Sequence, residues 1–78
     1  MSPQHADTVL DTKGLHCPMP MLKAKKALDS MQTGQVLQVI SDDAGTKTDI
    51  PALVSKTGHA LVAMKESEGL YEFLIRKQ

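Results

Sequence analysis

Apolar and polar residues alternate along this chain with two different periods, which predicts alternating strands and helices. Residues 8–10 form a short extended segment that ends at the polar run 11–14. Residues 21–31 contain no Gly or Pro, and their apolar side chains recur at helical spacing at Met21, Ala24, Leu28 and Met31. We therefore expect a strand and then an amphipathic helix, with Gly34 ending that segment.

The middle of the chain predicts a second strand and a second helix. Residues 36–40 are mostly apolar and β-branched, which is typical of a strand buried on both faces. A second helical stripe follows, which Gly58 closes at the position that a C-cap favours; its residues are Ile50, Leu53, Val54 and Thr57.

Pro51 leaves two alternatives for this second helix. Either one helix runs from about Ala44 and is kinked at Pro51, or Asp49 caps a shorter helix that has Pro51 in its first turn. Both alternatives place the apolar stripe on the same side.

The last third predicts a β-hairpin. Residues 60–65 and 70–76 read as strands joined by the short loop 66–69, and the odd positions Tyr71, Phe73 and Ile75 share one face. The order is then β-α-β-α-β-β, and right-handed crossovers place both helices on one side of the sheet. The predicted fold is an α/β (α+β) two-layer sandwich, with a four-stranded mixed sheet and two helices on one face.

Length and composition limit where chemistry can occur. A chain of 78 residues is expected to form a single domain, 1–78, with residues 1–7 flexible. Domains of this size bury only about 60–65% of their unfolded surface, so we expect a surface site and no deep pocket. A hydrophobic fraction of 41% and a charged fraction of 23% favour a globular chain over a disordered one.

The single cysteine and the balanced charge exclude several classes of protein. One Cys allows neither an internal disulfide nor a thiolate zinc cluster, and no apolar run approaches the length of a membrane span. A formal net charge of zero does not favour nucleic-acid binding. We expect a cytoplasmic protein with no metal and no direct nucleic-acid or membrane partner.

Cys17 stands out because of its position. Pro18 fits the first helical position and Pro20 still falls in the first turn, which predicts that Cys17 is the N-cap. The positive end of the helix dipole then predicts a moderately lowered pKa for the thiol. Since neither proline has an N–H, Met19 and Met21 are the expected backbone donors to the sulfur. A buried, inert cysteine is the alternative.

The histidines offer poor material for a nucleophilic enzyme, which needs a positioned base. His16 is adjacent to Cys17, and adjacent side chains usually diverge; His5 lies in the terminus and His59 beside the second helix's C-cap, where a structural role is expected. A reactive thiol without a base or a resolving cysteine fits a carrier, whose partners supply the catalytic machinery.

Other polar and apolar groups around the first helix predict docking. Lys23 and Lys26 share one helix side, with Lys25 about 100° away from Lys26. They form either a solvated face or a docking face for an acidic protein or tRNA surface. The five methionines are expected as core filler; Met19 and Met21, which flank the thiol, are the candidates for an apolar docking rim. The aspartates Asp42, Asp43 and Asp49 are interpreted as helix-capping residues in preference to cation ligands.

Residues 10–20, Leu-Asp-Thr-Lys-Gly-Leu-His-Cys-Pro-Met-Pro, resemble the D-x-x-G-x-x-C-P-x-P signature of the TusA/SirA family of sulfur carriers. The similarity continues through residues 41–44, 48–51 and 69–77. It implies the β-α-β-α-β-β two-layer fold and a persulfide on Cys17, with no other cofactor. It also implies that Pro18 and Pro20 set the helix start, while Asp11 and Gly14 shape the loop before it.

The resemblance implies partners in one of three pathways. A cysteine desulfurase or rhodanese is the expected donor, and a DsrE-like or other thiol-bearing protein is the expected acceptor. The family's carriers serve tRNA 2-thiolation, molybdenum-cofactor enzymes or dissimilatory sulfur oxidation. His16 and Met19 depart from the Arg and Glu common in the tRNA branch, and Met19 is more similar to the sulfur-oxidation branch; Ala44 stands where members often have Pro.

Two alternatives remain beside the carrier. One is a non-catalytic regulatory module that binds a partner through Lys23, Lys25 and Lys26 and whose cysteine is incidental. The other, with least support, is a small thiol-dependent transferase.

Overall fold

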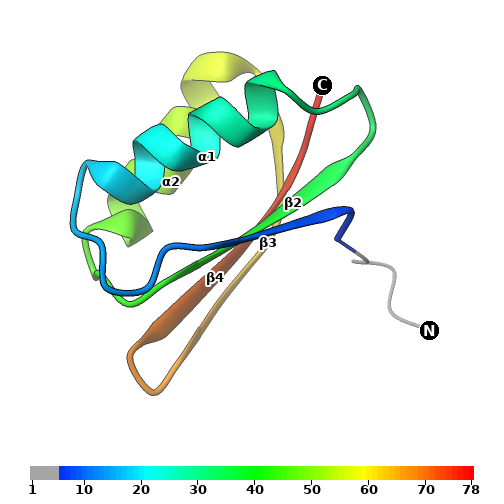
Figure 1. Ribbon diagram of the computed structural model, residues 1–78. Coiled ribbons are helices and arrows are strands. Elements are labelled where there is room, and N and C mark those ends of the chain that lie inside the picture. Colours follow the sequence, from blue (N-terminus) through cyan, green and yellow to red (C-terminus); the bar gives the residue numbers. More distant parts are fainter. Residues whose placement is uncertain (1–5) are drawn as a thin grey trace.

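The structure is a computed structural model and describes residues 6–78. Six elements follow one another in the order β-α-β-α-β-β (Figure 1), which confirms the predicted order. Their bounds are β1 Thr8–Asp11, α1 Met19–Asp29, β2 Val36–Ser41, α2 Thr46–Thr57, β3 Ala60–Ser67 and β4 Leu70–Arg76.

The expectation of a flexible terminus over residues 1–7 falls largely on residues 1–5, His5 among them, which lie outside the described residues. Asp7 is paired with Val36 at the start of β2. The Asp7 N–H donates to the Val36 carbonyl at 2.8 Å, and the Val36 N–H donates to Asp7 Oδ2 at 2.8 Å. The described chain is therefore anchored to the sheet from Asp7 onward.

The four strands form one mixed sheet in the order β1-β2-β4-β3. β1 and β2 are parallel, whereas β4 is antiparallel to both β2 and β3. Both helical crossovers, β1 to β2 and β2 to β3, therefore advance in the same direction across the sheet. Crossovers of one hand that advance in one direction put their helices on one face, and Figure 1 shows α1 and α2 together on one side. The predicted two-layer fold is confirmed.

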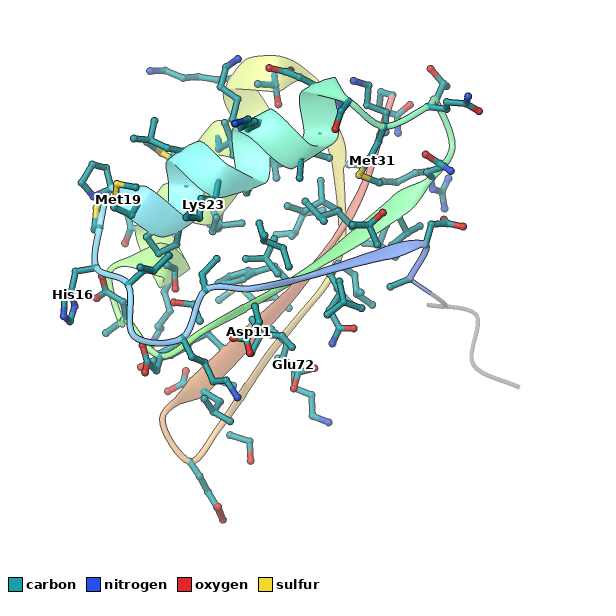
Figure 2. All side chains as sticks on the ribbon, in the orientation of Figure 1. Asp11, His16, Met19, Lys23, Met31 and Glu72 are labelled. Carbon is teal, nitrogen blue, oxygen red and sulfur yellow. The ribbon has the colours of Figure 1, made fainter. Side chains whose placement is uncertain are left out.

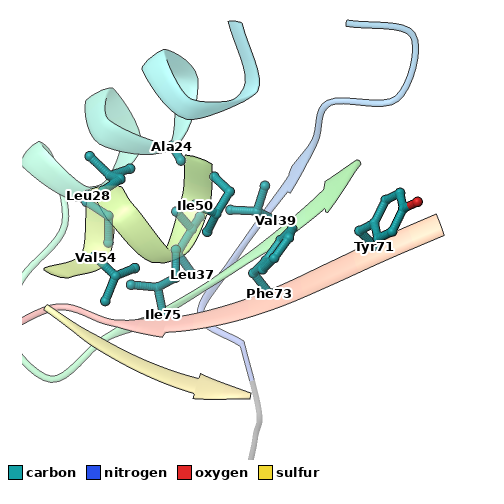
Figure 3. Packing of buried hydrophobic residues seen from close by; sticks show 10 residues of the cluster. Ala24, Leu28, Leu37, Val39, Ile50, Val54, Tyr71, Phe73 and Ile75 are labelled. Atoms are coloured by element: carbon teal, nitrogen blue, oxygen red, sulfur yellow. The ribbon is translucent and has the colours of Figure 1, made fainter. Parts of the chain in front are cut away.

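The core fills the space between the helices and this face of the sheet (Figure 3). Register pairs Leu37 with Ile75 and Val39 with Phe73, so these four side chains point the same way, and all four are buried. The helices contribute buried side chains from their apolar stripes, namely Ala24, Leu28, Ile50, Leu53 and Val54. Tyr71, Phe73 and Ile75 lie on the buried face, as predicted.

β2 differs from the prediction that both of its faces are buried. Only the alternate positions Leu37, Val39 and Ser41 are buried, while the positions between them are half-buried. The reason is that both helices of residues 6–78 lie on the other face of the sheet. There Gln38 Nε2 donates to Glu72 Oε1 at 3.0 Å, a polar pair on the uncovered side of the sheet; Glu72 is labelled in Figure 2.

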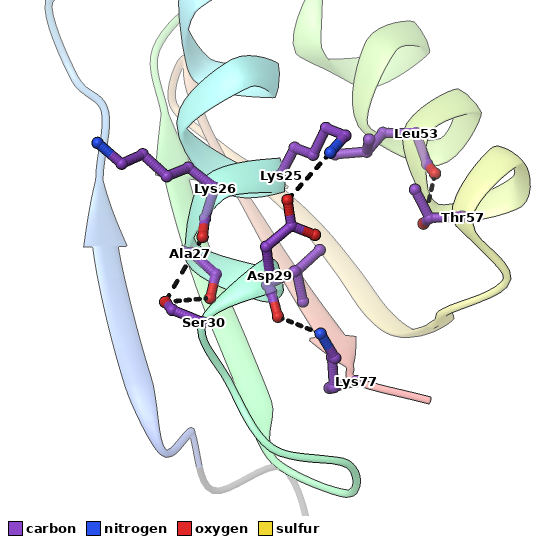
Figure 4. A network of polar contacts seen from close by, with 9 residues as sticks. Lys25, Lys26, Ala27, Asp29, Ser30, Leu53, Thr57 and Lys77 are labelled. Carbon is purple, nitrogen blue, oxygen red and sulfur yellow. Dashed lines mark hydrogen bonds and ion pairs between the residues drawn. The ribbon is translucent and has the colours of Figure 1, made fainter.

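α1 begins two residues earlier than the helical pattern, and its N-cap is Pro18 rather than Cys17, which corrects that prediction. Pro20 lies in the first turn and is buried. The helix ends at Asp29, before Met31. Two side chains donate to its last carbonyls: Ser30 Oγ donates to the Ala27 carbonyl at 3.0 Å, and Lys77 Nζ donates to the Leu28 carbonyl at 2.5 Å (Figure 4).

α2 runs through Pro51, so the alternative in which Asp49 caps a shorter helix is wrong. The helix starts at Thr46, and its first-turn N–H groups bond to the carbonyls of residues 43–45. Gly58 ends it with φ +79°, the left-handed conformation predicted for the C-cap. Thr57 is exposed and not part of the buried stripe, because its hydroxyl turns back to the Leu53 carbonyl at 2.8 Å (Figure 4).

The β3–β4 connection is tighter than the predicted four-residue loop. β3 extends to Ser67 and β4 starts at Leu70, which leaves a two-residue turn. Glu68 and Gly69 have φ of +50° and +80°. Two positive φ values match the type I′ turn, whose twist suits an antiparallel hairpin.

Replacing Ile50 by Ala should destabilise the fold by about 2–5 kcal/mol, because this fully buried side chain joins α2 to the sheet. Leu22→Ala is the matched control. Leu22 is 49% exposed on α1, so we expect a change within about 0.5 kcal/mol. Urea unfolding measures both; equal losses would contradict the assignment of the core.

Candidate functional site

The loop that carries Cys17 starts from a fixed point at the end of β1. Thr12 is fully buried, and both its N–H and its Oγ1 donate to the Ile40 carbonyl of β2, at 2.7 and 2.6 Å. The Leu15 N–H then returns to the Thr12 carbonyl at 3.1 Å. Buried polar groups need such partners, so this end of the loop has little freedom to move.

Asp11 and Gly14, which the resemblance implies as loop-shaping residues, both make contacts in this loop. Asp11 Oδ1 accepts from the Lys13 N–H at 3.0 Å. Gly14 has φ +86°, a conformation that glycine adopts without strain. Its N–H lies 3.2 Å from each carboxylate oxygen of Asp42, which follows β2. The loop after β1 is therefore tied to the segment after β2.

Cys17 is exposed and rests against the segment that leads into α2. Its backbone N–H donates to Asp43 Oδ2 at 2.6 Å. A Cβ placed on Gly45 would lie only 3.5 Å from the Cys17 Cβ, so the two segments are in close contact. The Cys17–Pro18 peptide bond is cis. The cysteine thus lies between the N-terminal ends of both helices.

The thiol itself donates a hydrogen bond to Asp49 Oδ2 in the first turn of α2. This bond is the main reason why the pKa of Cys17 is raised above its ordinary value; desolvation and the negative charges of Asp49 and Asp43 act in the same direction. The predicted lowering of this pKa is therefore wrong. The two carboxylates act against the expected effect of the helix dipole, because each of them favours the protonated thiol.

Within residues 6–78, neither of the backbone donors expected at the sulfur, Met19 and Met21, forms a hydrogen bond with it. The Met19 N–H bonds to the His16 carbonyl at 2.8 Å, within the loop. Asp43 instead receives the backbone bonds: Gly45 N–H at 3.0 Å and Cys17 N–H. These two bonds lower the pKa of Asp43, and the positive charge of His16 contributes further. Asp43 stays ionised and holds the Cys17 backbone in place.

Sequence reasoning interpreted Asp43 and Asp49 as helix-capping residues and missed their contacts with Cys17. One signal pointed to these contacts. β1 and β2 were predicted to be joined through a helical crossover, and the carboxyl ends of two adjacent parallel strands meet at one edge of a sheet. The loops that follow them, with Cys17 in one and Asp43 in the other, therefore come together there.

The residues expected to dock a partner lie beside the start of α1 and along the helix up to Lys26 in its last turn. His16 and Met19 are exposed and lie together at the end of the molecule where α1 begins (Figure 2). Lys25 is paired with Asp29 at 3.0 Å (Figure 4). Within residues 6–78, Lys23 and Lys26 are exposed and form no ion pair. The lysines of α1 without an ion pair are thus Lys23 and Lys26, the two that were expected to share one side of the helix.

A groove of about 400 Å³ runs between α1 and α2. Met21, Ala52 and Leu53 line it, and Lys25 and Lys56 contribute as well. Neither Cys17 nor Asp49 lines this groove. Of the two methionines expected as an apolar rim at the thiol, Met21 is half-buried, packs against the core and lines the groove, whereas Met19 is exposed.

His59 has the structural role that was expected. Its Nδ1 accepts the Gln78 N–H at 3.0 Å, which ties the C-terminus to the start of β3. In the described part of the chain no three His, Cys, Asp or Glu side chains are grouped as ligands for a metal ion. Over the same residues, neither helix has the length and apolar character needed to cross a lipid bilayer.

Comparisons with known proteins agree with this architecture. The family model described as Sulfurtransferase TusA matches residues 8–77. The sulfur carrier protein TusA of Allochromatium vinosum is 48% identical over 71 residues, which cover 91% of this chain and 93% of the relative. The putative sulfur carrier protein YrkI of Bacillus subtilis is 40% identical over 72 residues, covering 92% and 96%.

A solved structure is similar throughout. The SirA-like protein of Desulfitobacterium hafniense superposes with a TM-score of 0.76 at 26% identity, over 88% of this chain and 95% of that one. Both the sequence comparisons and the structural comparison thus extend over nearly the whole chain.

Asp49→Asn should lower the pKa of Cys17, because the substitution removes a charge and the main acceptor of the thiol proton. Each unit of decrease raises the thiolate fraction about tenfold below the pKa and lowers its intrinsic nucleophilicity about threefold, so alkylation at pH 7 should accelerate roughly threefold to fourfold per unit. The measurement is the rate of labelling by iodoacetamide.

The control for this experiment is Asp29→Asn, which also removes one carboxylate charge. Asp29 lies at the C-terminal end of α1, away from Cys17. Asp29 contacts Lys25 and not the thiol, so its variant should label at the wild-type rate. Slower labelling in Asp49→Asn would show that the carboxylate activates the thiol, contrary to the assignment.

Proposed function

The chain belongs to the TusA family, and from this premise we propose that it is a sulfur carrier that holds sulfane sulfur as a persulfide on Cys17 and passes it to an acceptor protein. The observation that carries the proposal is the exposed Cys17 on a loop anchored to both parallel strands. An exposed sulfur at a fixed position can enter the active site of another protein and leave again.

The transfer needs no chemistry beyond exchange between sulfurs. The Cys17 thiolate attacks the outer sulfur of a donor persulfide, a new S–S bond forms at Sγ, and the donor's S–S bond breaks. The donor's inner sulfur leaves and takes the proton that Cys17 has lost. Release to an acceptor thiol repeats these steps in reverse. Because the chain has one cysteine, no internal thiol can displace the bound sulfur as a disulfide.

The carrier role fits this site better than an enzymatic one. The relatives described above are named sulfur carrier proteins, although the family description uses the word sulfurtransferase. His16, the histidine next to Cys17 in the chain, makes no side-chain hydrogen bond to Cys17 in the described residues. The group that accepts the thiol's hydrogen bond is the Asp49 carboxylate, which raises the pKa of Cys17. A carrier can leave thiol activation to its partners.

We infer that the donor is a cysteine desulfurase or a rhodanese and that the acceptor is a DsrE-like or other thiol-bearing protein. The residues that would meet them are His16 and Met19 beside the thiol and the unpaired Lys23 and Lys26 along α1. The lone, unpaired cysteine supports a reducing, cytoplasmic setting.

The regulatory module without thiol chemistry makes a different prediction for sulfur loading. Slow alkylation of Cys17 at neutral pH does not separate the two hypotheses, because the raised pKa of Cys17 makes a carrier's thiol slow to label as well. Transfer of sulfur itself does separate them.

Incubation with a cysteine desulfurase and cysteine should add one sulfur atom to the chain, seen as intact mass and removed by reductant. Cys17→Ser should gain none, since no other thiol is available. A wild-type protein that stays unmodified, or a Cys17→Ser variant that gains sulfur equally, would contradict the carrier function.

Reversing the charge of the docking lysines should slow protein-mediated loading. In the double variant Lys23→Glu, Lys26→Glu, we expect the KM of the desulfurase for this chain to rise roughly tenfold, by loss of attraction to an acidic donor surface. Loading by a small persulfide should be unchanged. The matched control is the double variant Lys65→Glu, Arg76→Glu, which reverses two exposed charges on β3 and β4. An equal effect of the control variant would assign the change to net charge alone.

A further inference from the structure

We propose that Asp49 makes Cys17 a site that releases sulfur rather than one that retains it. The proposal rests on the proposed carrier function and on one contact, the hydrogen bond from the Cys17 thiol to Asp49 Oδ2. This contact is available only to the empty carrier, because only the thiol has a proton on Sγ to donate.

The two states of Cys17 face the same carboxylate in different ways. The empty thiol donates its proton to Asp49 and is stabilised. A persulfide is a stronger acid than a thiol, so the loaded carrier is an anion at neutral pH and has no proton for Asp49. Instead it meets a negative charge, and like charges at this distance repel. Asp49 therefore favours the empty state and disfavours the loaded one.

Other charged groups around Cys17 do not cancel this effect. Asp43, from the segment before α2, holds the Cys17 backbone N–H and is also negative. His16, in the same loop, is near enough to act on the charge of Asp43. α1 begins with Met19 and has no acidic residue in its first turn, and its nearest lysine, Lys23, comes one turn later. The charged groups that are hydrogen-bonded to Cys17 are thus the carboxylates of Asp43 and Asp49.

The exchange reaction makes this bias measurable as an equilibrium. Glutathione persulfide and Cys17 thiol give Cys17 persulfide and glutathione: one S–S bond breaks, one forms, and the thiol proton ends on the glutathione sulfur. Both persulfides are anions, so charge balances. An equilibrium is the right readout, because Asp49 also changes the reactivity of the thiol and rates would mix the two effects.

In Asp49→Asn, the equilibrium constant for loading at pH 7 should rise roughly tenfold, because the amide removes the repulsion and can donate to the persulfide anion. Asp49→Glu keeps the carboxylate and should restore most of the wild-type value. Intact mass at fixed ratios of glutathione persulfide to glutathione gives the loaded fraction. Asp29→Asn, remote on α1, should behave as wild type.

The pH dependence separates this role from a merely structural one. Above the pKa of Cys17 the empty carrier is a thiolate, which Asp49 also repels, so the advantage of Asp49→Asn over wild type should shrink as pH rises through that pKa. A structural defect would change loading equally at every pH. Circular dichroism confirms folding, and Asp49→Ser replaces Asp49→Asn if the latter does not fold.

The outcomes are distinct for this inference and for the carrier function. Equal loading constants in wild type and Asp49→Asn, or a difference that does not vary with pH, would overturn the role of Asp49 alone. If neither protein gains sulfur on Cys17, the carrier function is wrong and the role of Asp49 is wrong with it.

Discussion

The parallel pairing of β1 with β2 decides where the thiol lies and what surrounds it. Because both strands run in one direction, the loops that follow them leave the sheet at the same edge. Thr12, just after β1, fixes one loop to β2 through the Ile40 carbonyl. Just past the end of β2, Asp42 accepts from the Gly14 N–H and Asp43 accepts from the Cys17 N–H. A short loop with this many partners holds Cys17 against the first turn of α2. The site is therefore a property of the sheet topology more than of the helix start at α1.

At that position two opposing electrostatic influences act on the sulfur. The N-terminal ends of two helices favour an anion, whereas the carboxylates of Asp43 and Asp49 favour the neutral thiol. The thiol is in direct hydrogen-bond contact with Asp49, whereas the Met19 N–H at the start of α1 bonds to the His16 carbonyl. Protonated Cys17 is a poor nucleophile. For a protein that depends on partners for sulfur transfer, low reactivity of the empty thiol in free solution limits its modification by unrelated electrophiles and oxidants.

The sequence predicts the fold well, because each element has a local signal. Helical spacing located Ala24 and Leu28, alternation located Phe73 and Ile75, and the β-α-β-α-β-β order then left few arrangements for the sheet. The errors occurred where tertiary contacts decide. The half-buried outer face of β2 depends on what covers the sheet, and the direction of the Cys17 pKa shift depends on Asp49, which lies 32 positions away along the chain. Local spacing carries no information on such a pair, so a motif read only around Cys17 identifies the thiol but not its electrostatic environment.

The hydrogen bond between Cys17 and Asp49 also shows how a small chain with one cysteine can control an exposed thiol. A thiol in a deep pocket has its protonation and access set by many groups, but an exposed thiol on a chain of 78 residues has few neighbours available. Here the largest contribution comes from one carboxylate, Asp49, on a helix that is packed into the core through Ile50 and Val54. The core fixes the position of Asp49, because Asp49 is the neighbour of Ile50 in the chain. Rigidity of the small core is thus transmitted to the sulfur through a single turn of α2. The thiol can be exposed to partners and still be held in a defined protonation state.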